Sequence, residues 1–471
     1  MTPVGVGVSI RYNSTPKNNA MQAYSERQPG HKLHMNKSAR LVDVNHGTMN
    51  RRIFVDDDIH RQELEQVFGR CWLFIGHESQ ISKPNDFIAA YMGEDPVLVA
   101  RDSKNKIHAF LNMCRHRGNR ICRADFGNAP SFMCTYHGWT FATDGKLVGV
   151  PGYKEAYFEE LDRSQWGLVE AGRIDSYKGL IFATWDRSAP SLADYMGDAA
   201  WWLDLLVDRR DGGTEVIGGA DRWSLNCNWK LGADNFAGDG YHFPITHGSS
   251  INVGAVRQNQ GDTASRINTG RHPVTVGNGH NVLGGYDGPG VNPAIQSRQN
   301  SVITDYYAQT LPELQARLGE IRGKQAAINV ANMFPNFTWH PAPLVRCWQP
   351  RGPGKTEIWS YCIVDKNAPS EVKAAMRRNH TLTFSASGIV EQDDMNNFIQ
   401  VTSTARSPRG KSVPVNQIMG LGHEIKHEFL PGTISPANVS ESNQRAFYAR
   451  WQEMMDASSW SDIHIDPKTT S

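Results

Sequence analysis

The sequence has almost no excess charge of either sign and no long apolar run. Its 49 Lys and Arg residues are balanced by 48 Asp and Glu residues, which leaves a formal net charge of +1. Proteins that bind nucleic acids or membrane surfaces usually carry a basic excess, so the composition argues against both partners. No stretch reaches the roughly 18 apolar residues that a membrane-spanning helix needs. The first residues also lack the basic start and apolar block of a signal peptide. We therefore expect a cytoplasmic protein.

Cysteine is scarce and odd in number. The 471 residues include seven cysteines, a thin set that does not suit a disulfide framework in a large chain. We expect a subset of them to bind metal instead. Internal repeats and low-complexity tracts are also lacking. The cysteines are Cys71, Cys114, Cys122, Cys134, Cys227, Cys347 and Cys362.

The pattern along the chain changes from irregular to strand-rich and then to mixed. Hydrophobic residues make up 39% of the chain, enough for a large core. We predict an α+β fold: a small all-β domain, and a larger α+β domain with a curved antiparallel sheet flanked by helices. The expected boundaries are an N-terminal arm over 1–45, a helical part of the larger domain over 46–70, the all-β domain over 71–190, and the rest of the larger domain over 191–471.

Shorter patterns predict individual elements. An acidic start and apolar spacing predict a helix over 56–72. The glycine-rich segment 277–291 is expected to be a long loop that could act as a lid. β-rich and helix-type patterns predict the remaining elements. These are strands over 72–77, 96–101, 106–114, 179–185 and 356–366, and helices over 192–207 and 371–384.

Two short Cys/His pairs form the first metal-binding pattern. Cys114-Arg-His116 is followed, after seventeen residues, by Cys134-Thr-Tyr-His137. Two thiolates and two imidazoles suit either zinc or a [2Fe–2S] cluster in which two His replace two Cys on one iron. Zinc fingers usually place both Cys first and both His later, on a helix. Here each loop carries one Cys and one His, which favours a two-iron cluster. Cys122 lies between the loops and is expected to be a packed thiol.

A second pattern lies in the segment 228–250. Asp239 and His242 are three residues apart, a spacing that puts them on one face of a helix. Pro244 should break that helix and let His247 swing back toward His242. Two His and one carboxylate form the facial triad of non-haem Fe(II) sites, and the carboxylate could be Asp239 or one from the acidic cluster 391–394. Taken alone, two such His residues are more often ordinary polar residues at a helix end.

Both patterns together resemble one family: the α subunits of Rieske non-haem iron ring-hydroxylating oxygenases, in the naphthalene and biphenyl dioxygenase group. The resemblance runs from about residue 50 to 460. The motifs that carry it are CRHRGNRIC, CTYHGWTF, NWKLGADNF, DGYHFPITH, MFPNFT, EQDDMNNF and NQRAFYARW.

The resemblance assigns roles to these residues. It implies that Cys114, His116, Cys134 and His137 bind a Rieske [2Fe–2S] cluster. It also implies that His242, His247 and Asp394 bind a mononuclear Fe2+, so the distant Asp394 replaces the nearby Asp239. Asp239 then resembles a bridging carboxylate, which accepts hydrogen bonds from His242 and from a cluster His of the neighbouring subunit, His137.

The resemblance further implies partners and a reaction. It implies a small β subunit in an α3β3 hexamer, and a ferredoxin and an NADH-dependent reductase that deliver electrons. The expected activity is that of a terminal oxygenase, which inserts both atoms of O2 into an aromatic ring to give a cis-dihydrodiol. Which ring it oxidises is left open by the sequence.

The positions that match the family's substrate pocket are mostly apolar, as a flat hydrocarbon requires. His340 is unusual because the family more often has an apolar residue there, and Val390 replaces a bulkier residue. Our first expectation is a bicyclic or larger aromatic hydrocarbon. An aromatic carboxylate such as phthalate is the alternative, with His340 or Arg346 as the counter-charge. The pocket positions are Asn235, Phe236, Gly240, Phe243, Ile328, Val330, His340, Pro343, Phe384 and Val390.

Three other classes of protein would explain part of the sequence pattern. A Rieske electron carrier would explain the first pattern but not the roughly 280 residues that follow it. A zinc hydrolase would explain His and Asp residues but predicts a colourless protein. A Rieske monooxygenase or demethylase would share the architecture, and the acidic motif around Asp394 favours the dioxygenase group instead.

Overall fold

The computed structural model describes residues 41–253, 271–286, 300–324 and 326–469. Residues 1–40, which hold most of the predicted arm, lie outside this range. The arm was predicted to extend to residue 45, and this end is wrong. Leu41 and Val42 are buried, and strand β1 (Val42–Asp43) pairs with β2 (Thr48–Asn50) in a small sheet completed by β20 (Pro414–Asn416).

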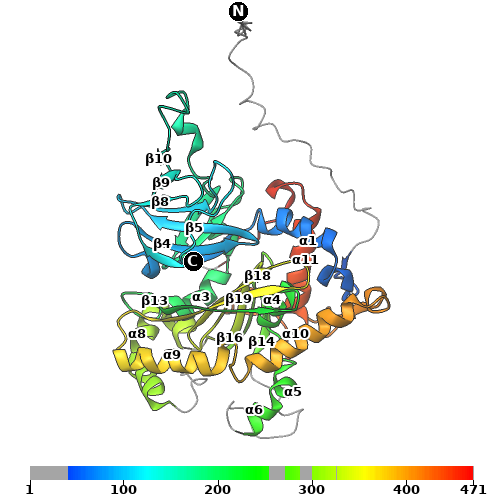
Figure 1. Ribbon diagram of the computed structural model, residues 1–471. Coiled ribbons are helices and arrows are strands. Elements are labelled where there is room, and N and C mark those ends of the chain that lie inside the picture. Colours follow the sequence, from blue (N-terminus) through cyan, green and yellow to red (C-terminus); the bar gives the residue numbers. More distant parts are fainter. Residues whose placement is uncertain (1–40, 254–270, 287–299, 325, 470–471) are drawn as a thin grey trace, which may run out of the picture. The chain divides into compact units, whose positions relative to one another are not determined.

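The strand-rich region contains three small antiparallel sheets (Figure 1). A four-stranded sheet has the order β6 (Ile107–Leu111), β5 (Asp95–Arg101), β4 (Asp86–Met92) and β7 (Phe126–Asn128). A three-stranded sheet has the order β10 (Leu147–Gly149), β9 (Thr140–Ala142) and β8 (Ser131–Met133). A third has the order β11 (Arg173–Tyr177), β12 (Leu180–Thr184) and β3 (Leu73–His77).

A nine-stranded antiparallel sheet forms the centre of the larger domain (Figure 1). The α+β prediction is therefore confirmed. In spatial order its strands are β13 (Thr214–Leu225), β19 (Thr356–Asp365), β18 (Leu344–Pro350), β17 (Phe337–His340), β16 (Ala326–Met333), β15 (Asn281–Tyr286), β14 (His272–Thr275), β22 (Thr433–Ile434) and β21 (Ile425–Lys426).

Helices cover this sheet. Helix α9 (Ser370–Phe384) packs on β19 and β13, and α4 (Trp229–Phe236) packs on β16, β17 and β18. Helix α8 (Ser301–Lys324) packs on β16, and α11 (Ser442–Asp456) packs on β14 and β15. Helix α10 (Glu391–Arg406) follows α9 in the chain. In the described ranges, no helix is both long and apolar enough to span a membrane.

Aromatic packing joins the small β11–β12–β3 sheet to the large one. The ring of Phe74 on β3 lies 4.9 Å from Phe337 on β17 and 5.6 Å from Tyr361 on β19. Phe182 on β12 lies 5.7 Å from Phe74 and 5.4 Å from Phe337. All four rings are buried. Tilted and edge-on contacts at these distances are favourable for aromatic pairs, so this cluster holds the two sheets against each other.

The glycine-rich segment was predicted as a long loop and a possible lid, and for residues 281–286, which form strand β15, this prediction is wrong. Gly277 and Gly279 have φ of +84° and +77°, and His280 N–H donates to Gly277 O at 2.8 Å. The glycines thus form the tight turn between β14 and β15, because only glycine adopts such φ values without strain. Strand β15 then pairs with β16. Residues 287–291 lie outside the described ranges.

Two predicted helices are shorter than expected. The helix over 56–72 ends at Phe68: α1 (Asp57–Glu63), N-capped by Asp56, continues into one wide turn, η3 (Leu64–Phe68). The helix over 192–207 is interrupted at Gly197, whose φ is +48°, and divides into α2 (Leu192–Met196) and α3 (Ala199–Val207). The strand predicted over 106–114 is also shorter, whereas β19 and α9 match their predicted ranges within one residue.

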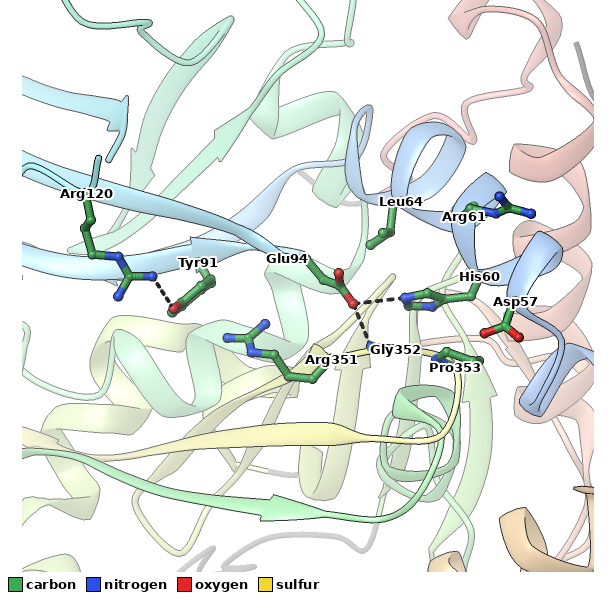
Figure 2. Close-up of a pocket in the computed structure, with 10 residues that line it drawn as sticks. All are labelled: Asp57, His60, Arg61, Leu64, Tyr91, Glu94, Arg120, Arg351, Gly352 and Pro353. Atoms are coloured by element: carbon green, nitrogen blue, oxygen red, sulfur yellow. Dashed lines mark hydrogen bonds and ion pairs between the residues drawn. The ribbon is translucent and has the colours of Figure 1, made fainter. Parts of the chain in front are cut away.

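A cleft of about 770 Å³ opens where α1 faces the β4–β5 turn and the turn that follows β18 (Figure 2). His60, Glu94 and Arg351 are among the side chains that line it. The carboxylate of Glu94 contacts the imidazole of His60 and the backbone N–H of Gly352.

Candidate metal centres

The two Cys/His pairs lie on two turns of the same construction. Cys114 N–H donates to Asn119 O at 2.8 Å, and Gly118 N–H donates back to Cys114 O at 3.0 Å. In the second turn, Cys134 N–H donates to Trp139 O at 2.7 Å, and Gly138 N–H donates to Cys134 O at 2.9 Å. Gly118 and Gly138 have nearly equal φ, +77° and +76°. Each turn therefore needs a glycine four residues after its Cys, so that the Cys and the His project from the same side of the turn.

The four side chains meet as a pair of thiols and a pair of imidazoles. The Cys114 and Cys134 thiols are buried and lie within hydrogen-bonding reach of each other. The rings of His116 and His137 are 4.6 Å apart. His116 Nδ1 is buried and has no hydrogen-bond partner, an arrangement that a metal bond would satisfy.

This pairing fits two irons better than one zinc. A tetrahedral zinc site brings all four ligand atoms to about 2.0–2.3 Å from one ion, so they lie within about 4 Å of one another. Among these four described residues, no three offer ligand atoms within 4.8 Å of one another. A Rieske cluster needs two thiolates at one iron and two imidazoles at the other, and the observed pairs supply this set.

Neighbouring groups shift the pKa values of the cysteines in this region. Burial raises the pKa of Cys134, but the Tyr136 N–H and the Asn119 amide, whose Nδ2 lies 3.6 Å from Sγ, outweigh it and lower the pKa. Trp139 stacks on His116 at 4.9 Å. Burial raises the pKa of the Cys122 thiol, which donates to Ala124 O. Cys122 is therefore a packed thiol with a hydrogen-bond acceptor of its own.

The second site is formed by the segment between α4 and α6 and by the first turn of α10. Asp239 and His242 were predicted to share a helix face, and this is wrong: α4 ends at Phe236, and the next helix, α5 (Phe243–Thr246), begins after His242. Pro244 was predicted to break a helix, but it lies in the first turn of α5, where a missing N–H is tolerated. His247 lies at the junction of α5 and α6 (Gly248–Asn252).

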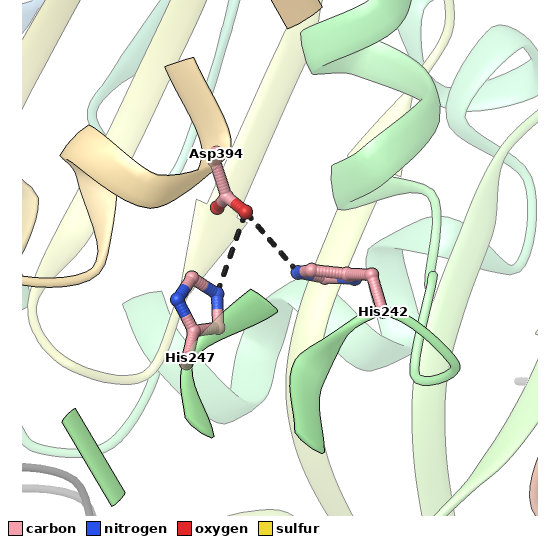
Figure 3. Close-up of side chains that lie close together, drawn as sticks. All are labelled: His242, His247 and Asp394. Atoms are coloured by element: carbon pink, nitrogen blue, oxygen red, sulfur yellow. Dashed lines mark ion pairs between the residues drawn. The ribbon is translucent and has the colours of Figure 1, made fainter. Parts of the chain in front are cut away.

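Three of the predicted ligands converge (Figure 3). Asp394 Oδ1 lies 3.4 Å from His242 Nε2 and 3.4 Å from His247 Nε2. The ligand atoms of the three residues all lie within 4.8 Å of one another, close enough to hold one ion. Asp394 is 147 positions from His247 in the chain, yet it is the carboxylate that completes the triad, whereas Asp239 is not.

Each imidazole of this triad contacts Asp394 through Nε2 and a second carboxylate through Nδ1. Asp239 Oδ2 lies 3.3 Å from His242 Nδ1, and Asp393 Oδ2 lies 3.3 Å from His247 Nδ1. Such carboxylates fix the tautomer and ring orientation of a metal-binding His. Sequence reasoning missed Asp393. Its only signal was its position next to Asp394 at the start of a helix.

The charges at this site attract a cation. Burial alone would lower the pKa of His242, but the carboxylates of Asp239 and Asp394 outweigh it and raise the pKa well above its usual value. Burial lowers the pKa of His247 and keeps its imidazole neutral, the form that binds metal. Two imidazoles and one carboxylate, with the rest of the coordination sphere left to other ligands, suit non-haem Fe(II).

The predicted pocket residues are only partly gathered around the triad. Asn235 Nδ2 lies 3.3 Å from His242 Nε2, and the Phe243 ring lies 5.2 Å from His247. Gly240 faces the side chain of Leu283, which pairs with Val330 in the sheet.

The remaining pocket positions lie on or beside the sheet and at the ends of α4, α9 and α10. Ile328 and Val330 are on β16, and Val390 is the N-cap of α10. Pro343 joins β17 to β18, and its carbonyl accepts from Ile363 N–H. Phe236 is buried, with its ring 5.2 Å from the guanidinium of Arg346.

The counter-charge predicted for a carboxylate substrate is already engaged. Arg346 is fully buried, and its guanidinium pairs with Glu391 at 2.9 Å and donates to Phe384 O at 2.8 Å. His340 Nδ1 accepts from Ala342 N–H at 2.9 Å, and its ring lies 4.7 Å from Phe384. The backbone N–H of Ala342 therefore occupies the Nδ1 atom of His340. Arg346 as a substrate counter-charge is therefore wrong.

The fold and the two sites define a Rieske-type oxygenase with a [2Fe–2S] domain and a mononuclear non-haem iron domain. Residues 71–171 match the Rieske [2Fe-2S] domain, and residues 192–457 match the ring hydroxylating alpha subunit (catalytic domain). The chain belongs to this family, the α subunits of aromatic ring-hydroxylating dioxygenases.

Characterised relatives cover nearly the full length. The chain is 41% identical to the biphenyl 2,3-dioxygenase subunit alpha of Rhodococcus jostii, over 90% of this chain and 92% of that protein. It is 41% identical to the chlorobenzene dioxygenase subunit alpha of a Cupriavidus species, over 92% and 97%. A solved structure of naphthalene 1,2-dioxygenase with bound indole superposes with a TM-score of 0.83 at 30% identity, covering 90% of this chain and 95% of that one.

Proposed function

We propose that this α subunit dihydroxylates an aromatic hydrocarbon, and that Cys114, His116, Cys134 and His137 bind its cluster while His242, His247 and Asp394 bind its iron. The observation that carries the proposal is the convergence of Asp394 Oδ1 on both imidazoles at 3.4 Å. That triad leaves coordination positions open on one side, which a dioxygenase needs and a closed structural metal site lacks.

The chain's own residues position the reactants. The iron, when bound, supplies the site at which O2 is activated for attack on two adjacent ring carbons. Phe243 and Asn235 flank the triad, and we expect the buried side chains of Phe384 and Val390 to help hold the ring and exclude water. Asp239 and Asp393 keep the two imidazoles in the orientation that the metal requires.

An uncharged ring suits this pocket better than a phthalate-type carboxylate. Binding a carboxylate in an apolar pocket requires a cation, because an unpaired buried charge is very unfavourable. Arg346 is already paired with Glu391, and Nδ1 of His340 already accepts from the backbone N–H of Ala342. The relatives named for biphenyl, chlorobenzene and naphthalene support the same choice, and we propose a cyclic or polycyclic hydrocarbon as the substrate.

We also propose that electrons cross between subunits of an α3β3 hexamer. Asp239 retains 35% of its side-chain exposure in the single chain, and Tyr241 and Ile245 beside it are 52% and 64% exposed. Next to the cluster ligands, Met133 and Tyr136 are 63% and 56% exposed. Large exposed apolar side chains beside both metal sites support contacts with neighbouring subunits. A ferredoxin and an NADH-dependent reductase would supply the electrons.

A reconstituted assay tests the proposal. The purified oxygenase, combined with a ferredoxin, an NADH-dependent reductase and 18O2, is offered biphenyl, naphthalene, benzene and phthalate separately. We expect a cis-dihydrodiol that carries two 18O atoms from at least one hydrocarbon and none from phthalate. Product from phthalate alone would overturn the substrate assignment. Incorporation of a single 18O atom would indicate a monooxygenase instead.

A further inference from the structure

The guanidinium of Arg346 contacts the ends of three helices. Its Nη2 donates to the carbonyl oxygen of Phe384, the last residue of α9, at 2.8 Å. Both of its Nη atoms contact the carboxylate of Glu391 in the first turn of α10, at 3.1 and 2.9 Å. The guanidinium also lies 5.2 Å from the ring of Phe236, the last residue of α4. One side chain therefore touches α4, α9 and α10 at once.

Arg346 is itself held rigidly by the large sheet. It lies in the middle of β18, opposite Thr338 on β17 and Ser360 on β19, and its side chain is fully buried. The rings of Trp223 and Trp348 lie 5.2 and 5.1 Å from its guanidinium. Such cation–π contacts and the planar shape of the guanidinium leave it few orientations. The sheet thus presents a fixed two-point donor to the helices that pack on it.

The start of α10 depends on this donor because it lacks a capping side chain. The N-cap residue is Val390, which makes no side-chain hydrogen bond to the helix, whereas Ser, Thr, Asp and Asn usually supply one. Glu391 and Asp394 are three residues apart in the first turn of α10, hence on one face. The contact between Glu391 and Arg346 therefore fixes the turn from which Asp394 reaches the two imidazoles (Figure 3).

Stability alone does not account for this buried ion pair. Taking a guanidinium and a carboxylate out of water is costly, and replacing such a pair with apolar residues is often neutral or stabilising. A bidentate pair is, however, far more directional than apolar packing. Because one guanidinium holds both the Phe384 carbonyl and Glu391, it joins the end of α9 to the start of α10 across residues 385–390. The pair thus specifies where α10 begins.

We propose that Arg346 is a positioning residue of the iron site, which through Glu391 sets the place of the Asp394 carboxylate between the two imidazoles. The guanidinium also packs on Phe236, and α4 leads directly into the segment that carries His242. Both sides of the triad are therefore positioned against one side chain. Neither Arg346 nor Glu391 binds the metal. The proposal rests on the iron site assigned above.

The decisive variant is Arg346→Met/Glu391→Leu, which removes both charges and should keep the fold. Chelator competition measures its iron affinity. Nitric oxide is then added to the Fe(II) protein, with the cluster left oxidised and EPR-silent, and gives an EPR signal whose shape reports the ligand geometry. We expect a loss of iron affinity of about tenfold, the lower end of the effect for groups that orient metal ligands, and an altered signal. Wild-type affinity together with a wild-type signal would overturn the proposal.

Arg346→Lys keeps the charge but not the two-point geometry, and it tests the proposal even if the double variant does not fold. An ammonium group cannot hold both Glu391 and the Phe384 carbonyl in a planar fork, so iron affinity should again fall and the signal should change. Arg377→Gln is the matched control, because Arg377 forms a bidentate pair with Asp221 that joins α9 to β13 rather than to α10. It should bind iron as wild type does.

Asp394→Ala separates a failure of this proposal from a failure of the iron site on which it rests. Wild-type iron affinity in Asp394→Ala would show that the assigned site is wrong. If Asp394→Ala loses iron while both Arg346 variants bind it as wild type does, the site stands and the positioning role is refuted. A loss of iron in Arg377→Gln as large as in the Arg346 variants would also contradict the role, since any broken ion pair would then have the same effect.

Discussion

Asp393 Oδ2 lies 3.3 Å from His247 Nδ1, the same separation as between Asp239 Oδ2 and His242 Nδ1. Each imidazole of the triad is therefore held between Asp394 and a carboxylate of its own. The outer carboxylates are not equivalent in sequence, since one precedes its His by three residues and the other comes from α10.

This arrangement predicts that Asp393→Ala weakens iron binding without removing it. Loss of a carboxylate behind a metal-binding His typically costs 10–100-fold in affinity. Iron remaining after dialysis against a graded series of chelator concentrations measures the change, and Asp393→Asn, which can still accept a hydrogen bond, should lose less. Asp394→Ala should lose iron entirely, and Asp58→Ala, an exposed acid on α1, should match wild type. Equal retention in Asp393→Ala and wild type would refute the role.

Asp239→Ala should separate metal binding from turnover. Neither the triad nor the Cys/His pairs include Asp239, so both metals should still bind, although iron should bind more weakly because Asp239 contacts His242 as Asp393 contacts His247. The variant is therefore assayed after it has been loaded with iron. If Asp239 links the two centres across subunits, product formation should nevertheless be abolished. Rapid mixing of the reduced variant with O2 and substrate follows cluster reoxidation through its visible absorption. Wild-type turnover would exclude the electron-bridging role.

The cluster assignment predicts different outcomes for cysteines twelve residues apart. Cys134→Ser should abolish the red-brown colour and the reduced-state EPR signal, because it removes a thiolate from the pair with Cys114. Cys122→Ser should retain both, since Cys122 is a packed thiol that donates to Ala124 O. A coloured, EPR-active Cys134→Ser protein, or a colourless Cys122→Ser protein, would be inconsistent with the geometry of the loops.

The two glycine turns should tolerate alanine unequally. Gly118 and Gly138 share a positive φ, so either substitution adds backbone strain of about 1–3 kcal/mol. A Cβ at Gly138 would also lie 2.9 Å from Pro151 Cγ, whereas a Cβ at Gly118 would meet nothing within 4 Å. Gly138→Ala should therefore lose more cluster per protein than Gly118→Ala, as measured by the ratio of visible to protein absorbance. Equal loss of cluster in the two variants would mean that backbone strain alone, and not the contact with Pro151, determines the effect.

Stability should fall as the pH drops below about 6.5, independently of the metal sites. Burial lowers the pKa of both His77 and His280 to about 4. Between the unfolded value near 6.5 and the folded value near 4, the unfolded chain binds more protons, so protonation favours unfolding. Each histidine contributes up to about 3 kcal/mol across this interval.

Denaturant unfolding at pH 7.5, 6 and 5 measures this effect, and substitution of either histidine by Gln should flatten the pH dependence. His46, which is exposed, is the control. A Gln variant with an unchanged pH dependence would contradict the assignment.

The sequence predicted the cluster site better than the iron site. The Cys114–His116 and Cys134–His137 spacings are local, so each turn is encoded within a few residues. Between His247 and Asp394 the chain forms strands β14 to β19 and helices α8 and α9. No local spacing in the sequence can therefore predict that these two residues meet. The prediction of Asp394 as the third ligand came from the family resemblance, because the spacing alone left Asp239 as another candidate.

The errors have physical causes of the same kind. Gly277 and Gly279 give the composition of a loop, but they form a turn because β15 finds partners in β14 and β16 that only the folded sheet provides. Spacing placed Asp239 and His242 on a helix, but Gly238, at φ +127°, follows the end of α4 and directs the chain out of the helix. Arg346 was read as available because Glu391, its partner 45 residues away, could not be identified from the sequence.

The proposed iron ligands come from the α4–α6 segment and α10, whereas the predicted pocket residues Ile328, Val330, His340 and Phe384 come from β16, β17 and the end of α9. Chemistry and ring preference are thus encoded on separate parts of the chain. If these four residues line the pocket, as predicted, substitutions there should change which hydrocarbon is accepted without altering the proposed iron ligands. A subunit organised in this way can acquire new substrates by small evolutionary steps while its oxygen chemistry is conserved.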